Sequence, residues 1–183
     1  MKNNSVRTIV AVGIGAALFF VLGRFVAIPS PVPNTNVSSQ YGLLAFMAAL
    51  FGPVAGALIG LIGHALIDFS YGWGIWWSWV IASAGFGALA GLAAKRLHLA
   101  DGEFAKKDIL VFNLFQAVSH VAAWFLIAPA LDILIYAEPA NKVFLQGAVA
   151  GAANIVTTAV IGTLLCVAYA SSKPKKGNLR AEN

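Results

Sequence analysis

Four polar or amphipathic side chains recur at helical spacing within the apolar segment 109–136. They follow one another at steps of three, four and four: Asn113, Gln116, His120 and Trp124. Such steps place all four on one face of a helix. Polar groups are expensive inside a bilayer and often mark function there. We therefore predict that this face lines a ligand cavity and does not serve only to join helices. Gln146 and Asn154 share a similar wide face on the next apolar segment.

A second pair of polar residues, His64 and Asp68, is four residues apart and can pair on one helix. We interpret it first as a structural hydrogen bond near the membrane surface; proton transfer is the alternative. The sequence contains no GxxxxGK[ST], HExxH or GxSxG motif. Its single cysteine, Cys166, excludes a cysteine-based metal site. We predict no catalytic residue, no metal site and no cofactor.

Tryptophans cluster in the segment 73–79, which reads WGIWWSW. Such a cluster is typical of an aromatic belt at the membrane surface. The alternative is stacking on a flat, ring-bearing ligand. Adjacent residues point to different sides, so Trp76 or Trp77 is the candidate for that contact.

A proline-rich segment, residues 29–40, carries three prolines and no charge. Prolines restrict its backbone, and Asn34, Asn36 and Gln40 offer neutral hydrogen-bonding groups. It is either a rigid polar lid over a cavity or a simple turn, and the sequence leaves both open.

The helices that position these residues can be predicted from composition, which indicates a membrane protein. Of 183 residues, 60% are hydrophobic and 10% are charged, whereas a soluble domain carries roughly 25% charged residues. Spanning helices need about 20 apolar residues. The expected spans are residues 6–28, 37–51, 54–71, 76–97, 109–136 and 143–171. The prediction is an all-α integral membrane protein, a single domain of six transmembrane helices over residues 1–183.

The count of six depends on the Gly52-Pro53 break, and charge supports it. With six spans, all twelve basic residues except Arg24 and Lys142 lie on one side. The positive-inside rule then puts both termini in the cytoplasm. The net charge of +5 follows from this clustering at the chain ends and one loop, so no nucleic-acid partner is expected.

Small residues at four-residue spacing suggest close helix packing in lipid. Pairs or triplets of this kind occur on four segments: Ala11/Gly15 and Gly13/Ala17, Gly52/Gly56/Gly60, Gly87/Gly91, and Gly147/Gly151. Packing within the chain is the expected reason. For the first segment, packing against a partner protein is equally open.

Three blocks of sequence resemble one known family, and the likeness extends over the whole chain. The blocks are IPSPVPNTN at residues 28–36, FGP at 51–53 leading to IGHALID at 62–68, and WWSWVI at 76–81. They resemble the substrate-binding S components of energy-coupling factor (ECF) transporters, the vitamin-importing class of ABC transporters. The subfamily resembles those linked to cobalamin and to the pyrimidine precursor of thiamine.

The resemblance implies a multi-pass protein of the bacterial cell membrane that is not an enzyme. It implies vitamin capture from outside and delivery by toppling in the membrane. Its implied partners are a transmembrane coupling subunit and two ATPase subunits, which supply the energy. In this family the first helix docks on the coupling subunit through small residues, here best matched by Ala11, Gly15 and Ala16.

The uncharged loop and the amide-bearing face suit a mostly neutral, ring-containing ligand, with cobalamin first and the thiamine pyrimidine precursor second. The predicted substrate-binding residues are Asn34, Asn36, Gln40, Tyr41, Trp76, Trp77, Asn113, Gln116, His120, Trp124 and Asn154. The competing hypothesis is a stand-alone membrane carrier or membrane enzyme that uses His64 and Asp68, or His120. The third hypothesis is that the chain is a purely structural subunit of an assembly.

Overall fold

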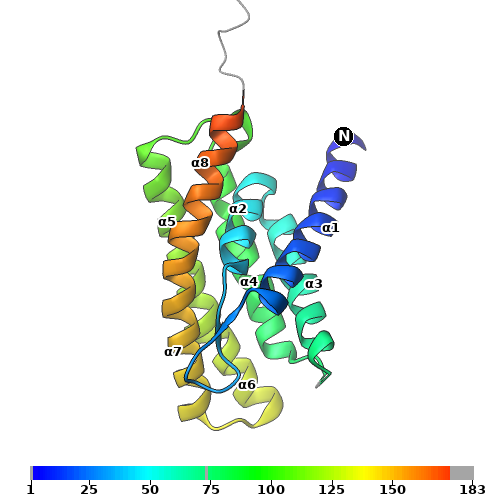
Figure 1. Cartoon of the computed structure of the whole chain (residues 1–183), viewed down its shortest axis with the longest axis vertical. Coiled ribbons are helices and arrows are strands. Elements are labelled where there is room, and N and C mark those ends of the chain that lie inside the picture. Colours follow the sequence, from blue (N-terminus) through cyan, green and yellow to red (C-terminus); the bar gives the residue numbers. More distant parts are fainter. Residues whose placement is uncertain (1, 73, 174–183) are drawn as a thin grey trace, which may run out of the picture.

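The structure, a computed structural model, describes residues 2–72 and 74–173 (Figure 1). It contains six long helical rods, four of them in a single piece or nearly so. These four are α1 (Lys2–Phe25), α2 (Gln40–Phe51), α3 (Pro53–Tyr71) and α4 (Trp77–Gly91), the last extended by a 3-10 turn over Leu92–Lys95. A second 3-10 turn, Leu99–Asp101, lies in the connection that follows. The six predicted helices are therefore all present.

The last two rods each contain a wider, π-helical stretch in the middle. The fifth is α5 (Lys106–Val121), the stretch Ala122–Ile127, and α6 (Ala128–Tyr136). The sixth is α7 (Ala140–Thr157), the stretch Thr158–Gly162, and α8 (Thr163–Ser172). Between α1 and α2 the chain forms a short antiparallel hairpin of β1 (Ile28–Pro29) and β2 (Asn36–Val37).

Five of the rods are long and apolar enough to cross a membrane, and α2 is the shorter exception. Its 12 residues span roughly 18 Å at 1.5 Å per residue, against about 30 Å of hydrocarbon. The chain turns at Gly52, whose φ of +88° lies in the region that favours glycine. Pro53 then starts α3, where its missing N–H costs nothing. The predicted break and the short second helix are confirmed.

Glycines bring α3 and α4 into backbone contact. A Cβ added at Gly56 would collide with the carbonyl oxygen of Gly87, and one added at Gly60 with that of Ser83. Gly91 approaches Pro53 in the same way. The small-residue spacing on these two segments thus serves packing within the chain, as it does in membrane bundles generally.

The small residues predicted to dock a partner are buried inside this chain. Ala11, Gly15 and Ala16 on α1 are covered, and a Cβ at Gly15 would lie 2.6 Å from Cδ1 of Ile59 on α3. The structure therefore contradicts a partner contact through these three residues, since α3 occupies that face. Among the residues of α1 whose exposure the structure describes, Gly13 and Ala17 are small and exposed, and a Cβ at Gly13 would meet no atom within 4 Å.

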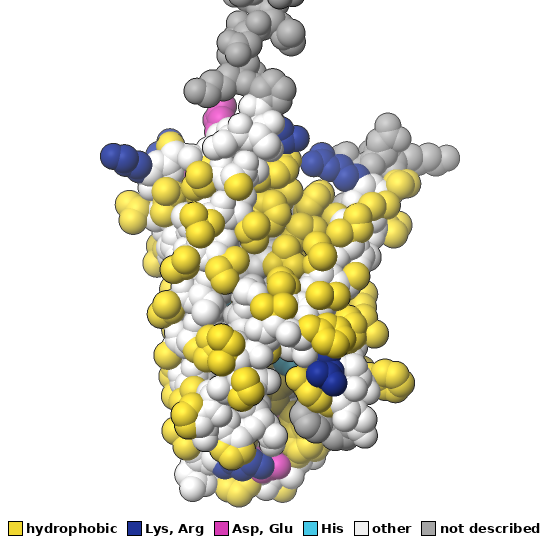
Figure 2. All heavy atoms as spheres, viewed as in Figure 1, with side chains coloured by type: hydrophobic (Ala, Val, Ile, Leu, Met, Phe, Trp, Pro, Cys, Tyr) yellow, Lys and Arg dark blue, Asp and Glu magenta, His cyan; other side chains and the backbone are white. Residues whose placement is uncertain are grey.

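The surface is apolar around the middle of the bundle and basic at one end. In Figure 2, yellow hydrophobic side chains are spread over the visible face among white groups, and several Lys and Arg side chains gather at the top. That end holds the start of α1, the connection from α4 to α5, and the end of α8 (Figure 1). At the opposite end, α3 runs into α4 and α6 into α7.

Candidate ligand-binding site

Two adjoining cavities lie where the α3–α4 connection, the α6–α7 connection and the β1–β2 hairpin meet. The larger has a volume of about 300 Å³ and is lined by Asn34, His64, Asp68, Trp76, Trp79, Asp132, Glu138, Lys142 and Gln146. The smaller, of about 120 Å³, is lined by Gly23, Ala27, Asn34, Thr35, Asn36, Ser38, Gln40, Tyr41, His64, Ile67, Asp68, Tyr71, Trp79, Trp124, Ala150 and Asn154. Four residues line both cavities: Asn34, His64, Asp68 and Trp79.

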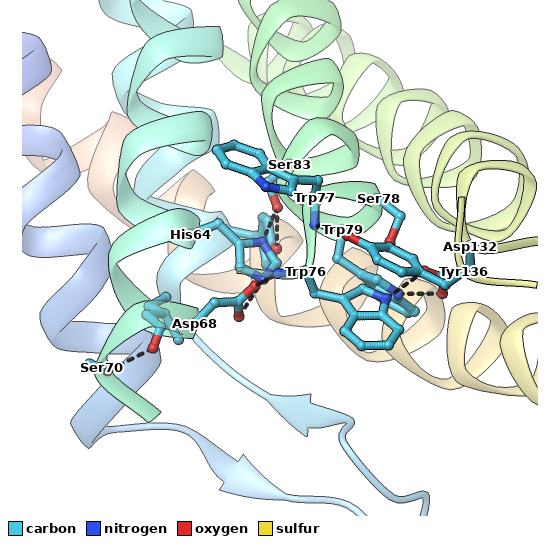
Figure 3. Close-up of polar contacts among 12 residues, drawn as sticks. His64, Asp68, Ser70, Trp76, Trp77, Ser78, Trp79, Ser83, Asp132 and Tyr136 are labelled. Atoms are coloured by element: carbon cyan, nitrogen blue, oxygen red, sulfur yellow. Dashed lines mark hydrogen bonds and ion pairs between the residues drawn. The ribbon is translucent and has the colours of Figure 1, made fainter. Parts of the chain in front are cut away.

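One buried carboxylate organises the aromatic wall of the larger cavity. Asp132 on α6 accepts hydrogen bonds from the indole Nε1 of Trp76 at 2.6 Å and of Trp79 at 2.7 Å, and from the hydroxyl of Ser78. Figure 3 shows these side chains converging on it. A buried charge needs such donors. The start of α4 is thereby fixed to α6.

Aromatic stacking extends this wall in two directions. The Trp76 ring stacks on Tyr136 with centroids 4.2 Å apart. Trp79 stacks on Trp124 at 5.3 Å, and Trp124 meets the Tyr41 ring edge-on at 5.2 Å. These contacts between the rings hold the wall together, and Trp76 and Trp79 also line the larger cavity.

His64 and Asp68 form the polar side of both cavities. Asp68 Oδ2 accepts the backbone N–H of Trp76 at 2.9 Å, while its Oδ1 lies 3.6 Å from Nε2 of His64. His64 Nδ1 is 2.5 Å from Oγ of Ser83, whose hydroxyl also lies 2.8 Å from the Tyr41 hydroxyl. The pair is thus linked through Ser83 to the middle of the bundle (Figure 3).

The proline-rich hairpin lies against α7 beside the cavities. Gln146 Nε2 donates to the carbonyl oxygen of Pro33 at 2.9 Å, and Thr157 Oγ1 donates to that of Ser38 at 3.2 Å. Asn34 has a φ of +58°, a conformation that asparagine tolerates better than most residues. The loop therefore has defined contacts with a helix and contributes to the cavity walls.

The structure gathers seven of the predicted substrate-binding residues around the cavities: Asn34, Asn36, Gln40, Tyr41, Trp76, Trp124 and Asn154. Trp77 lines neither cavity and is 47% exposed. Its backbone N–H donates to the Tyr136 hydroxyl instead. Of the two candidate tryptophans, Trp76 thus has the placement that a ligand contact needs.

Three polar residues of α5 lie away from both cavities, contrary to the prediction for that face. Asn113 Nδ2 donates to Thr163 Oγ1 at 3.0 Å, and Gln116 Nε2 lies 3.4 Å from the carbonyl oxygen of Ile155. His120 is buried between Thr158, at 3.0 Å, and the Trp124 indole N–H, at 2.8 Å. These three side chains therefore hydrogen-bond the fifth rod to the sixth.

Sequence reasoning missed Trp79 and Asp132 as cavity residues, and it placed Gln146 on a polar face without predicting that it binds substrate. Trp76 and Trp79 are three residues apart, so their shared helical face was a usable signal. Asp132 stands near the end of an apolar segment, where a carboxylate is ordinary. No local pattern indicates that it meets tryptophans more than 50 residues away in sequence.

Comparison with known proteins gives a consistent family. Residues 3–171 match the profile of the ECF-type riboflavin transporter, S component. A UPF0397 protein of Enterococcus faecalis (strain V583) is 55% identical over 175 residues, which cover 96% of each chain. A UPF0397 protein of Staphylococcus aureus (strain MSSA476) is 52% identical over 178 residues, 97% of each. No solved structure matches.

These matches confirm the expected S-component resemblance but not the cobalamin and pyrimidine-precursor subfamily, because the matching profile is of the riboflavin type. S components are multi-pass membrane proteins that bind the substrate of an ECF transporter, and they are not enzymes. The chain belongs to the family of ECF-type riboflavin transporter S components.

Proposed function

We propose that this chain captures a small, flat, ring-containing vitamin or vitamin precursor outside the bacterial cell and delivers it to an ECF module. The observation that carries the proposal is the pair of adjoining cavities beside the hairpin, with Trp76, Trp79 and Trp124 along their walls. Aromatic side chains together with placed polar groups are typical of a small-molecule site.

The distribution of charge supports an outward-facing site. The described basic residues Arg7, Lys95, Arg96, Lys106, Lys107 and Lys173 belong to the end opposite the cavities. The positive-inside rule assigns that end, and with it both termini, to the cytoplasm. The cavities then open on the outer side, where an importer must collect its substrate.

The volumes of the cavities favour a small ligand over cobalamin. About 300 Å³ is the lower limit of typical ligand pockets, and a cavity of roughly 150 Å³ accommodates benzene. Cobalamin combines a corrin macrocycle with a nucleotide arm and is far larger. The thiamine pyrimidine precursor, with one ring, fits these dimensions best. Riboflavin, named in the matching family description, has three fused rings and is the other candidate.

The ECF module is the expected partner: a coupling subunit and two ATPase subunits. We propose that α1 docks on the coupling subunit through its exposed side, around Gly13 and Ala17. Toppling then carries the loaded site across the membrane. The apolar surface of the bundle (Figure 2) is physically suited to such a rotation.

Calorimetry on the purified chain in detergent tests the proposal without ATP or partner subunits. We expect saturable one-to-one binding of the pyrimidine precursor or riboflavin, and none of cobalamin. If no compound in a vitamin panel binds, the proposal fails. Uptake into liposomes should require the complete module; uptake by this chain alone would favour the stand-alone carrier.

A further inference from the structure

Asn154 on α7 lines the smaller cavity. It is only 3% exposed, and its Oδ1 has no partner among the residues that the structure describes. An unpaired buried amide oxygen costs roughly 1–3 kcal/mol. A ligand that supplies a donor would remove this cost.

Asp68 on α3 presents a second oxygen to the same cavity. Its Oδ2 accepts the Trp76 backbone N–H, but its Oδ1 is 3.6 Å from the nearest ion-pair partner, His64 Nε2, beyond hydrogen-bonding distance. Asp68 is 7% exposed and lines both cavities. One buried unpaired amide oxygen, of Asn154, and one carboxylate oxygen, of Asp68, that accepts no hydrogen bond from the described residues therefore lie on two helices at the smaller cavity.

The charges around the site are negative overall. The described lining of the smaller cavity contains Asp68 but neither Lys nor Arg. In the larger cavity, Lys142 lies 2.6 Å from Glu138 and is neutralised by it, while Asp132 is surrounded by neutral donors. Arg24 lies outside both linings, with its guanidinium over the Tyr71 ring. An anionic ligand would meet uncompensated repulsion here.

We infer that the site selects a ring bearing an amino group beside a ring nitrogen, as in an aminopyrimidine, with Asn154 and Asp68 reading that edge. This rests on the proposed function and names its substrate class. An asparagine amide pairs with such an edge through two hydrogen bonds. A carboxylate accepts from the amino group or from a protonated ring nitrogen and stabilises the positive charge. Trp79, Trp124 and Tyr41 supply aromatic faces for the ring.

The two residues contribute differently to selectivity. The Oδ1 of Asn154 accepts no hydrogen bond from the described residues, so the amide can turn over and pair with either an amino or an oxo edge. A carboxylate has no donor when ionised and repels a carbonyl oxygen. Asp68 therefore provides the preference for amino over oxo, and Asn154 provides affinity for both.

Titration calorimetry with a matched pair of ligands tests this inference: 4-amino-5-hydroxymethyl-2-methylpyrimidine and its 4-oxo counterpart. The wild-type chain should bind the amino compound at least about 10-fold more tightly. Asp68→Asn should abolish that ratio. Asn154→Leu should weaken both compounds by roughly 10-fold and leave the ratio unchanged. Asp101→Asn, the same chemical change at the opposite end of the bundle, should alter neither.

The outcomes separate this inference from the proposed function. Equal binding of the two pyrimidines, or an unchanged ratio in Asp68→Asn, overturns the role of Asp68. Tight binding of riboflavin without binding of the aminopyrimidine overturns the substrate class and leaves vitamin capture intact. Absence of binding for every compound overturns both. The wild-type ratio needs no variant, so the test does not depend on the folding of any mutant.

Discussion

The indole nitrogen of Trp79 on α4 donates a 2.7 Å hydrogen bond to Oδ2 of Asp132 on α6. The same carboxylate accepts from Trp76 and Ser78, so one side chain holds three residues at the start of α4. Trp79 in turn stacks on Trp124. The aromatic wall of the candidate site is therefore organised by a residue that is itself only 1% exposed.

Asp132→Asn should loosen this wall. The carboxylate accepts hydrogen bonds at both oxygens, whereas an amide has only one oxygen. The amide NH₂ would therefore face one of the donors, and a buried N–H would be left unpaired at a cost of roughly 1–3 kcal/mol. We expect a lower Tm, a red-shifted tryptophan emission and weaker ligand binding. Scanning fluorimetry and emission spectra in detergent measure the first two effects.

Asp101→Asn is the control for this variant, since Asp101 is exposed in the connection between α4 and α5. It should leave the emission spectrum unchanged. An Asp132→Asn protein with wild-type emission and affinity would show that the carboxylate does not position the tryptophans.

Gly13→Leu and Gly15→Leu should separate docking from folding. A side chain at Gly13 meets open space, whereas one at Gly15 collides with Ile59. We expect Gly13→Leu to keep ligand affinity but to reduce co-purification with the coupling subunit. Gly15→Leu should lower stability, because overpacking typically costs about 1–3 kcal/mol.

Ala152→Leu places a leucine on the exposed side of α7 instead and should preserve the complex. Pull-down of the tagged module reports assembly, and calorimetry reports binding. If Gly13→Leu co-purifies as the wild type does, the docking face lies elsewhere on the chain.

Local sequence signals predicted the helices well because each signal depends on only a few neighbouring residues. Gly52 and Pro53 together end one helix and start the next, and the structure turns there. Small residues at Gly56 and Gly87 indicated close packing, which the structure confirms between α3 and α4. Such features follow from backbone geometry and need no knowledge of the neighbours.

The site was harder to predict. The periodicity of polar residues shows which side chains share a helix face, but it does not show whether another helix or a ligand packs against that face. Asn113 and Trp124 share one predicted face, yet Asn113 bonds to Thr163 and only Trp124 lines a cavity. In lipid, a polar side chain can be satisfied by a helix neighbour as well as by a ligand. The face of α1 was misassigned for the same reason, since Gly15 packs on Ile59.

A pair of identical substitutions should separate helix joining from ligand binding. Asn113→Leu removes a bond between rods and should cost about 0.6 kcal/mol, as such bonds average in membranes. Its ligand affinity should stay within about 2-fold, far below the effect of a lost direct contact. Asn154→Leu, the same change at the smaller cavity, should weaken binding clearly. Affinity loss in Asn113→Leu equal to that in Asn154→Leu would restore the α5 face as a ligand surface.

The contacts of the hairpin with α7 should set how fast ligand leaves. Gln146 and Thr157 hold the carbonyl oxygens of Pro33 and Ser38, and the hairpin contributes Asn34 to both cavities. A Gln146→Ala, Thr157→Val double variant removes both bonds. Each contributes roughly 0.5–1.5 kcal/mol, so losing both should raise the dissociation rate by about 5-fold or more if the hairpin must lift before ligand escapes.

Stopped-flow tryptophan fluorescence measures the association and dissociation rates of the ligand separately and so tests this prediction. Lifting the hairpin more easily should speed dissociation more than association, because the bonds are present in the loaded state and partly broken on entry. Thr163→Val, which removes a hydroxyl on α8 away from both cavities, controls for loss of a polar group in the same rod. If the double variant changes neither rate, residues 29–40 are the simple turn that the sequence left open, and ligand reaches the cavities by another route.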